Sequence, residues 1–145
     1  MDELLELRNY IEQQRYPEAL NLLAELEEMS RDDKINKIYS FTEILLLHLV
    51  KQTAEKRTTR SWDLSIQNAI CQIWRSNQRH KSKKYYLDNE ELHEIVTKSY
   101  PNALKYAALE AFGGVYETKQ LAQMVDRATI EQQAMTLIET YREED

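Results

Sequence analysis

The chain has 145 residues, a formal net charge of −6, two glycines, two prolines and one cysteine. That length fits one domain with a real core, and so few glycines and prolines argue against the tight turns of a β-sheet protein. Because strong helix formers dominate, we expect an all-α fold, a compact bundle of six or seven helices. The single domain should cover residues 1–142, with a disordered acidic tail at 143–145.

Cysteine usage and the amino terminus bear on the compartment. The lone Cys71 excludes an intramolecular disulfide, so an oxidising environment is not needed. The first ten residues are acidic and carry no apolar run of the kind found in signal peptides. We therefore expect a cytoplasmic protein.

The first 30 residues predict a helical hairpin. Apolar residues recur at helical spacing from Asp2 to about Gln14, and Pro17 stands where a proline can open a second helix. One face of that second helix is apolar, and glutamates occupy the other. Two amphipathic helices this close in sequence should lie antiparallel.

The most apolar helix is expected from Ile35 to Val50, at the centre of the fold. Six of the seven residues from Ile44 to Val50 are strongly apolar, with His48 among them. A helix apolar on most sides needs neighbours on several sides, and this run is too short to cross a bilayer. We expect Ser30 to cap it, which predicts a break between it and the hairpin.

Amphipathic helices should follow on the carboxy-terminal side. Thr59 or Ser61 can cap one, and Asp88 with Glu91 resembles a capping box. Pro101 either kinks that second helix or starts a new one. Gly113 and Gly114 should end the helix that precedes them. A short helix is expected at residues 118–125, and Thr129 should cap a final helix. The expected buried positions are Trp62, Ile66, Ala69, Ile70, Ile73, Leu92, Ile95, Val96, Ser99, Tyr100, Ile130, Ala134, Leu137, Ile138 and Tyr141.

Charge is strongly segregated along the chain. Residues 1–50 carry five basic and eleven acidic side chains (−6), residues 51–84 nine and two (+7), and residues 85–145 five and twelve (−7). Complementary charge of this kind favours contact with a protein, either another copy or a different one. The leading interpretation is therefore a small non-catalytic interaction or adaptor domain.

A second interpretation is a pocket for a small anion, or an enzymatic pocket, near the end of the central helix. Its candidates are His48, Lys51, Arg57, Arg60 and Trp62. Guanidinium, ammonium and imidazole groups beside an indole would suit a phosphate-like ligand. The alternative is structural: a core histidine, a tryptophan anchor, and bases that face solvent or complement a helix end.

A third interpretation is nucleic-acid binding through residues 75–84. The candidates are Arg75, Arg79, Lys81, Lys83 and Lys84, with Tyr85 and Tyr86 beside them. Basic side chains next to aromatic ones can bind phosphates and stack bases. The acidic chain as a whole weighs against it.

Catalytic and metal chemistry find little support in the sequence. Glu90 and His93 have the spacing of one di-iron motif, but the second motif that such bundles need is missing. Cys71 has no partner at metal-ligand spacing, and no glycine-rich phosphate loop occurs. We expect no catalytic residue, no metal and no cofactor.

Several segments, taken in order, resemble a bacterial family known as domain-of-unknown-function family 29. The most specific are Leu46-Leu47-His48-Leu49-Val50-Lys51 and Arg60-Ser61-Trp62 with Ser65-Ile66, at the family's separation. The remaining matches are Arg15-Tyr16, Leu22, Glu25, Met29, Tyr100, Ala103, Ala107, Ala108 and Glu110. The resemblance covers about residues 8 to 125, and residues 112–116 depart from the family pattern. It implies a compact helical fold and no particular activity.

Overall fold

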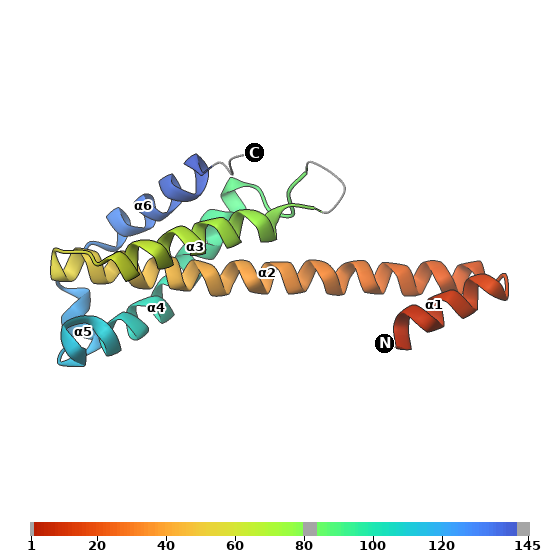
Figure 1. Ribbon diagram of the computed structural model, residues 1–145, viewed down its shortest axis with the longest axis horizontal. Helices are drawn as coiled ribbons and strands as arrows, with labels where there is room; N and C mark the ends of the chain where they lie inside the picture. Colours follow the sequence, from red (N-terminus) through yellow and green to blue (C-terminus); the bar gives the residue numbers. More distant parts are fainter. Residues whose placement is uncertain (1, 80–83, 142–145) are drawn as a thin grey trace. The chain divides into compact units, whose positions relative to one another are not determined.

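The computed structural model describes residues 2–79 and 84–141, and helices joined by short connections make up most of them (Figure 1). The helices are α1 (Asp2–Glu12), α2 (Tyr16–Glu55), α3 (Arg60–Asn77), α4 (Asn89–Glu110), α5 (Thr118–Ala122) and α6 (Arg127–Thr140), with a 3₁₀ turn, η1 (Ala111–Gly114). Within the described residues there is no strand, only an isolated bridge between Gln78 and Tyr85. The prediction of an all-α fold with six or seven helices is confirmed. The acidic tail at 143–145 lies outside the described residues.

Contacts divide the chain into two compact units, Met1–Lys34 and Ile35–Asp145, which are described separately. None of the helices in the described residues is both long enough and apolar enough to span a membrane.

The first unit holds the predicted hairpin. Helix α1 lies beside the first turns of α2 (Figure 1). Gln14, with a φ of 58°, reverses the chain between them, and the backbone N–H of Arg15 donates to the carbonyl of Tyr10 at 2.8 Å. The Arg15 guanidinium lies 4.8 Å from the centroid of the Tyr10 ring, which ties the turn to α1.

The predicted break before the central helix is wrong. Helix α2 continues through Ser30 and on to Glu55, so Ser30 caps nothing. Neither glycine nor proline occurs between Ser30 and Lys34. The capping residues there are exposed, and such residues cost a helix interior only a few tenths of a kcal/mol each. The helix ends instead at Glu55, and the next residue, Lys56, has a φ of 56°.

The core of the second unit is built around the central stretch of α2. Ile38, Leu45, Leu46, Leu49 and Val50 have no exposed surface. The predicted faces of α3, α4 and α6 pack with them in one cluster, which contains Ile66, Ala69, Ile70, Ile73, Leu92, Ile95, Val96, Tyr100, Ile130, Ala134 and Ile138. The helical spacing of apolar residues thus predicted these buried faces. Trp62, Leu137 and Tyr141 are half-buried instead.

Of the caps predicted in the second unit, two are confirmed and one is wrong. The Thr59 side chain accepts from the backbone N–H of Trp62, and Asp88 forms a full capping box with Glu91. The final helix begins earlier than predicted, because Asp126 accepts the backbone N–H of Thr129 and is the N-cap. Aspartate competes well with threonine for this role.

Pro101 lies inside α4 and does not end it. A proline has no N–H, so the carbonyl four residues earlier, that of Thr97, loses its helical partner. That carbonyl accepts a hydrogen bond from Nη2 of Arg127 at 2.8 Å. The guanidinium also lies 4.8 Å from the centroid of the Tyr100 ring. Arg127 therefore fills the gap that the proline leaves.

The turn after α4 contains two glycines, and their replacement should lower stability by different amounts. Phe112, Gly113 and Gly114 all have positive φ, of 52°, 68° and 80°. A Cβ on Gly114 would lie 2.8 Å from the carbonyl oxygen of Leu109, whereas a Cβ on Gly113 would meet open space. We expect Gly113→Ala to lower the free energy of unfolding by about 1 kcal/mol, the cost of left-handed backbone, and Gly114→Ala by more than twice that.

Chemical denaturation of both variants measures this difference. Equal destabilisation would show that the backbone near Leu109 yields easily.

Candidate functional site

The side chains that the sequence singled out meet at the carboxyl end of α2. The Nζ of Lys51 lies 3.0 Å from Oε1 of Glu110 in the last turn of α4, and only 7% of the lysine side chain is exposed. The same Nζ is 4.6 Å from the centroid of the Trp62 ring, in the first turn of α3. A buried ammonium thus joins α2, α3 and α4 through one ion pair and one cation–π contact.

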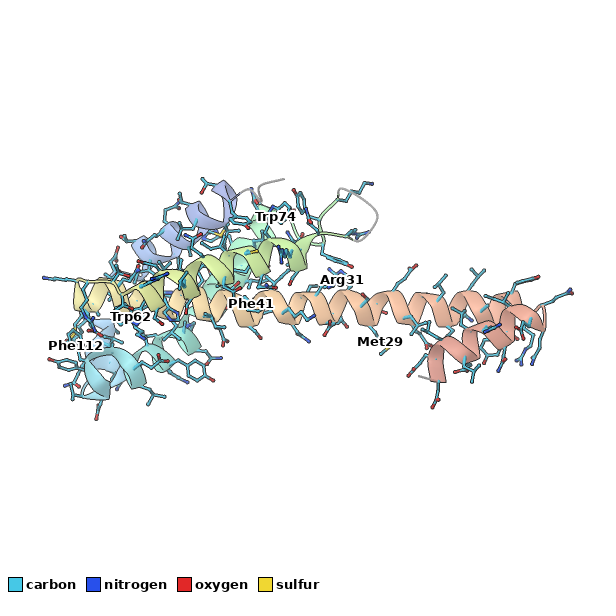
Figure 2. All side chains as sticks on the ribbon, viewed as in Figure 1. Met29, Arg31, Phe41, Trp62, Trp74 and Phe112 are labelled. Atoms are coloured by element: carbon cyan, nitrogen blue, oxygen red, sulfur yellow. The ribbon has the colours of Figure 1, made fainter. Side chains whose placement is uncertain are left out.

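A second cation reaches the same indole. The guanidinium carbon of Arg57 is 4.7 Å from the Trp62 centroid, and its Nε donates to Oε1 of Glu55 at 2.9 Å. The other carboxylate oxygen of Glu55 accepts the backbone N–H of Phe112 at 3.1 Å. Glu55 therefore holds the strained turn after α4 against the end of α2. Figure 2 labels Trp62 and Phe112 at this end of the second unit.

Polar contacts also order the connection between α2 and α3. The Thr58 hydroxyl donates to Oδ1 of Asp63 at 2.8 Å and accepts from the Gln52 amide at 2.7 Å. The same amide donates to Asp63 at 3.2 Å. With the Thr59 cap, these bonds fix the angle at which α3 leaves α2 and so place Trp62 over Lys51.

The structure brings together three of the five predicted pocket residues, Lys51, Arg57 and Trp62. His48 lies one turn earlier, half-buried, and its Nδ1 donates to the Ile44 carbonyl at 2.8 Å. A donating Nδ1 makes Nε2 the acceptor nitrogen in the neutral ring. Arg60 begins α3 with an exposed side chain.

Sequence reasoning missed two acidic members, Glu55 and Glu110. Glu55 follows Lys51 by four residues, a spacing that places both on one helix face, so a signal was present. Glu110 is 59 residues from Lys51, and no local pattern connects them. Because each of the two cations has a carboxylate partner, this geometry favours packing of the three helix ends. The anion pocket stays a prediction.

The nucleic-acid candidates are only partly described. Lys81 and Lys83 lie outside the described residues. The guanidinium of Arg79 is 5.4 Å from the Tyr86 ring centroid, and its backbone N–H donates to the Lys84 carbonyl at 2.9 Å. Arg75 and Lys84 have exposed side chains. Nucleic-acid binding by this segment also stays a prediction.

Glu90 and His93 are the pair with the spacing of a di-iron motif. Both line a cavity of about 230 Å³ between α4 and α6. Within residues 2–79 and 84–141, no group of three or more His, Cys, Asp or Glu side chains could hold a metal ion.

Glu55 should make the free energy of unfolding depend on pH in the acidic range. Burial raises the pKa of its carboxyl, but the Phe112 N–H, the hydrogen bond and charge of Arg57, and the charge of Lys51 together hold the pKa below its usual range. A pKa lowered by folding contributes stability above the unfolded-state value, and that stability is lost as the pH falls below about 4.5. We expect Glu55→Gln to be destabilised at pH 7 and to lose less stability than the wild type on acidification.

Urea unfolding at pH 7 and pH 4 measures this effect. Parallel losses in the two proteins would show that other carboxyls account for the acid dependence.

The comparisons with known proteins give one match. The model of the family described as "Domain of unknown function DUF29" matches residues 6–136. No curated protein and no solved structure matches the chain. The matched range contains the ion-paired Lys51, the indole of Trp62 and Glu110, and it runs through residues 112–116 to α6, further than the expected 125. The chain therefore belongs to the family of domain of unknown function DUF29.

Proposed function

We propose that the chain is a non-catalytic protein-interaction domain whose amino-terminal hairpin, residues 2–34, docks on a basic, partly apolar surface of another protein. The main observation in support of this proposal is that the apolar side chains of the hairpin are exposed. In the described residues of this unit, Ala19 is the one buried residue. The large apolar side chains that remain exposed are Leu4, Leu5, Ile11, Tyr16, Leu20, Leu23 and Met29.

Two helices offer each other too little surface to bury this set. Leu7, Leu22 and Leu26 are half-buried, whereas Leu20 and Met29 are 65% and 61% exposed. Isolated exposed leucines are ordinary, but a group of seven within one hairpin supports a binding role.

Charge defines the partner. Residues 1–34 carry ten acidic and four basic side chains, a net charge of −6. Two such hairpins would repel each other, so pairing between hairpins is disfavoured. A partner with lysines and arginines around an apolar seam would be complementary. We place this contact in the cytoplasm, in agreement with the absence of any need for disulfides.

The experiment compares two triple variants of equal chemistry. Leu5→Gln with Leu20→Gln and Met29→Gln removes exposed apolar surface from the hairpin. Leu64→Gln with Leu109→Gln and Val115→Gln does the same at positions that are 60%, 73% and 72% exposed in the second unit. Circular dichroism should show unchanged helix content in both.

Crosslinked partners are then captured by the wild type and both variants across a salt series, while light scattering follows self-association. We expect a basic partner that the wild type and the control variant both capture at low salt, and that is captured neither by the hairpin variant nor at high salt. Self-association that the hairpin variant abolishes would identify a second copy as that partner. A salt-indifferent monomer that captures the same proteins in all three forms would overturn the proposal.

A further inference from the structure

A cavity of about 440 Å³ opens in the second unit, where α3, α4 and α6 meet the segment before α4. Its floor is apolar and comes from Ile73, Leu87, Leu92 and Ile138, none of them more than 8% exposed. Trp74, which is labelled in Figure 2, and Tyr85 add aromatic walls. The volume lies within the range of small-ligand sites.

The walls are held in place by contacts among the lining residues and with Tyr141. The Trp74 ring meets the Tyr141 ring edge-on, with centroids 5.9 Å apart. The buried Asn77 side chain donates to the Leu87 carbonyl at 3.0 Å and accepts the Leu87 N–H at 2.8 Å. The amide of Asn77 is therefore occupied in fixing the wall, and the cavity is formed before any ligand arrives.

The polar rim is acidic. Asp88 and Glu139 line the cavity, and among its described lining residues there is no lysine or arginine. Glu139 already interacts with another residue, so Asp88 is the carboxylate of the rim that would bind a ligand. Oδ1 of Asp88 accepts the N–H of Glu91 at 2.9 Å. A carboxylate has about four acceptor positions, which leaves Asp88 able to accept a further donor. Glu90 and Glu91 add negative charge in the next turn.

Among the described residues, Arg79 and Lys84 are basic side chains near this region that do not line the cavity. The Arg79 guanidinium lies over the ring of Tyr86. An apolar floor, an indole wall and a carboxylate rim together match one chemistry, an alkyl chain that ends in a positive charge.

We propose that this cavity binds a lysine or arginine side chain of a peptide from another protein. The methylene stem lies along Leu87, Leu92 and Ile138, and the charged head donates to Asp88 beside the Trp74 ring. The site belongs to the second unit and does not depend on the hairpin, so either proposal can fail without the other. A free polyamine shares the chemistry and differs in lacking a peptide backbone.

The test uses the full chain and four probes. These are acetyl-Gly-Arg-Gly-amide, acetyl-Gly-Lys-Gly-amide, the arginine peptide with neutral citrulline in place of arginine, and spermidine. Binding is followed by NMR shifts of the Trp74 indole N–H and the Leu87 backbone N–H. We expect saturable shifts with the two cationic peptides and at least tenfold weaker binding of the citrulline peptide, because a charge-assisted hydrogen bond is lost.

Two aspartate variants separate charge from folding. Asp88→Asn removes the charge and keeps a good N-cap, so α4 should remain intact while the affinity falls about tenfold. Asp126→Asn makes the same change at the N-cap of α6, outside the residues that line the cavity, and should bind like the wild type. Equal affinity for arginine and citrulline peptides, or wild-type affinity in Asp88→Asn, would overturn the proposal. Binding of spermidine with no response to either cationic peptide would overturn the assignment to a peptide.

Discussion

Leu46→Ala is expected to lower the free energy of unfolding by about 3 kcal/mol, because removing a fully buried leucine side chain loses burial and leaves a cavity. Leu46 has no exposed surface and packs in the main core cluster of the second unit. Leu20→Ala is the matched control in the same helix. Leu20 is 65% exposed, so its replacement should change stability by less than about 0.5 kcal/mol.

Urea denaturation followed by circular dichroism measures both variants. The comparison holds helix, residue type and replacement constant, so the difference reports burial alone. A loss of more than 1 kcal/mol in Leu20→Ala would show that the hairpin leucines are buried in solution, and it would count against the hairpin as an open docking surface.

Glu110→Ala is expected to cost about 3 kcal/mol, because it leaves the buried Lys51 ammonium without its carboxylate. The two ends of this ion pair differ in exposure, at 7% for the lysine side chain and 49% for the glutamate. Lys51→Met should therefore cost much less, since the glutamate left behind can be solvated and methionine keeps the apolar stem. The double variant should be close to Lys51→Met alone.

Thermal and urea unfolding of the two single variants and the double variant give the coupling energy between the residues. A strong positive coupling is expected, with Lys51→Met rescuing Glu110→Ala. Additive losses would show that the ammonium gains its stability from Trp62 and not from Glu110.

The contacts made by each end of α2 explain why apolar side chains are buried in the second unit and exposed in the hairpin. At the carboxyl end of α2, Lys51 and Glu55 engage α3, α4 and the turn at Phe112, so the helix end has partners on several sides. The residues of α2 before Lys34 meet little beyond α1 within their own unit, and their leucines stay exposed. One helix therefore provides both a core element and the proposed docking surface.

What the sequence by itself determined was local or periodic. The buried faces of α3, α4 and α6 follow from apolar residues at helical spacing, and Thr59 and Asp88 satisfy backbone groups within three residues of themselves. The three candidates Lys51, Arg57 and Trp62 were found because they lie within twelve positions of one another. Ser30 misled for a related reason: capping residues are also tolerated inside an exposed helix.

What only the tertiary structure decided depends on pairs far apart in the chain. The effect of Pro101 could not be read locally, because the carbonyl it frees is satisfied by Arg127, 30 residues beyond Thr97. The ion pair of the buried Lys51 depends on the distant Glu110, and α6 supplies one wall of the cavity beside Trp74. Hydrogen bonds and ion pairs act over a few ångströms in space, and the sequence specifies that proximity only through the packing of the whole core.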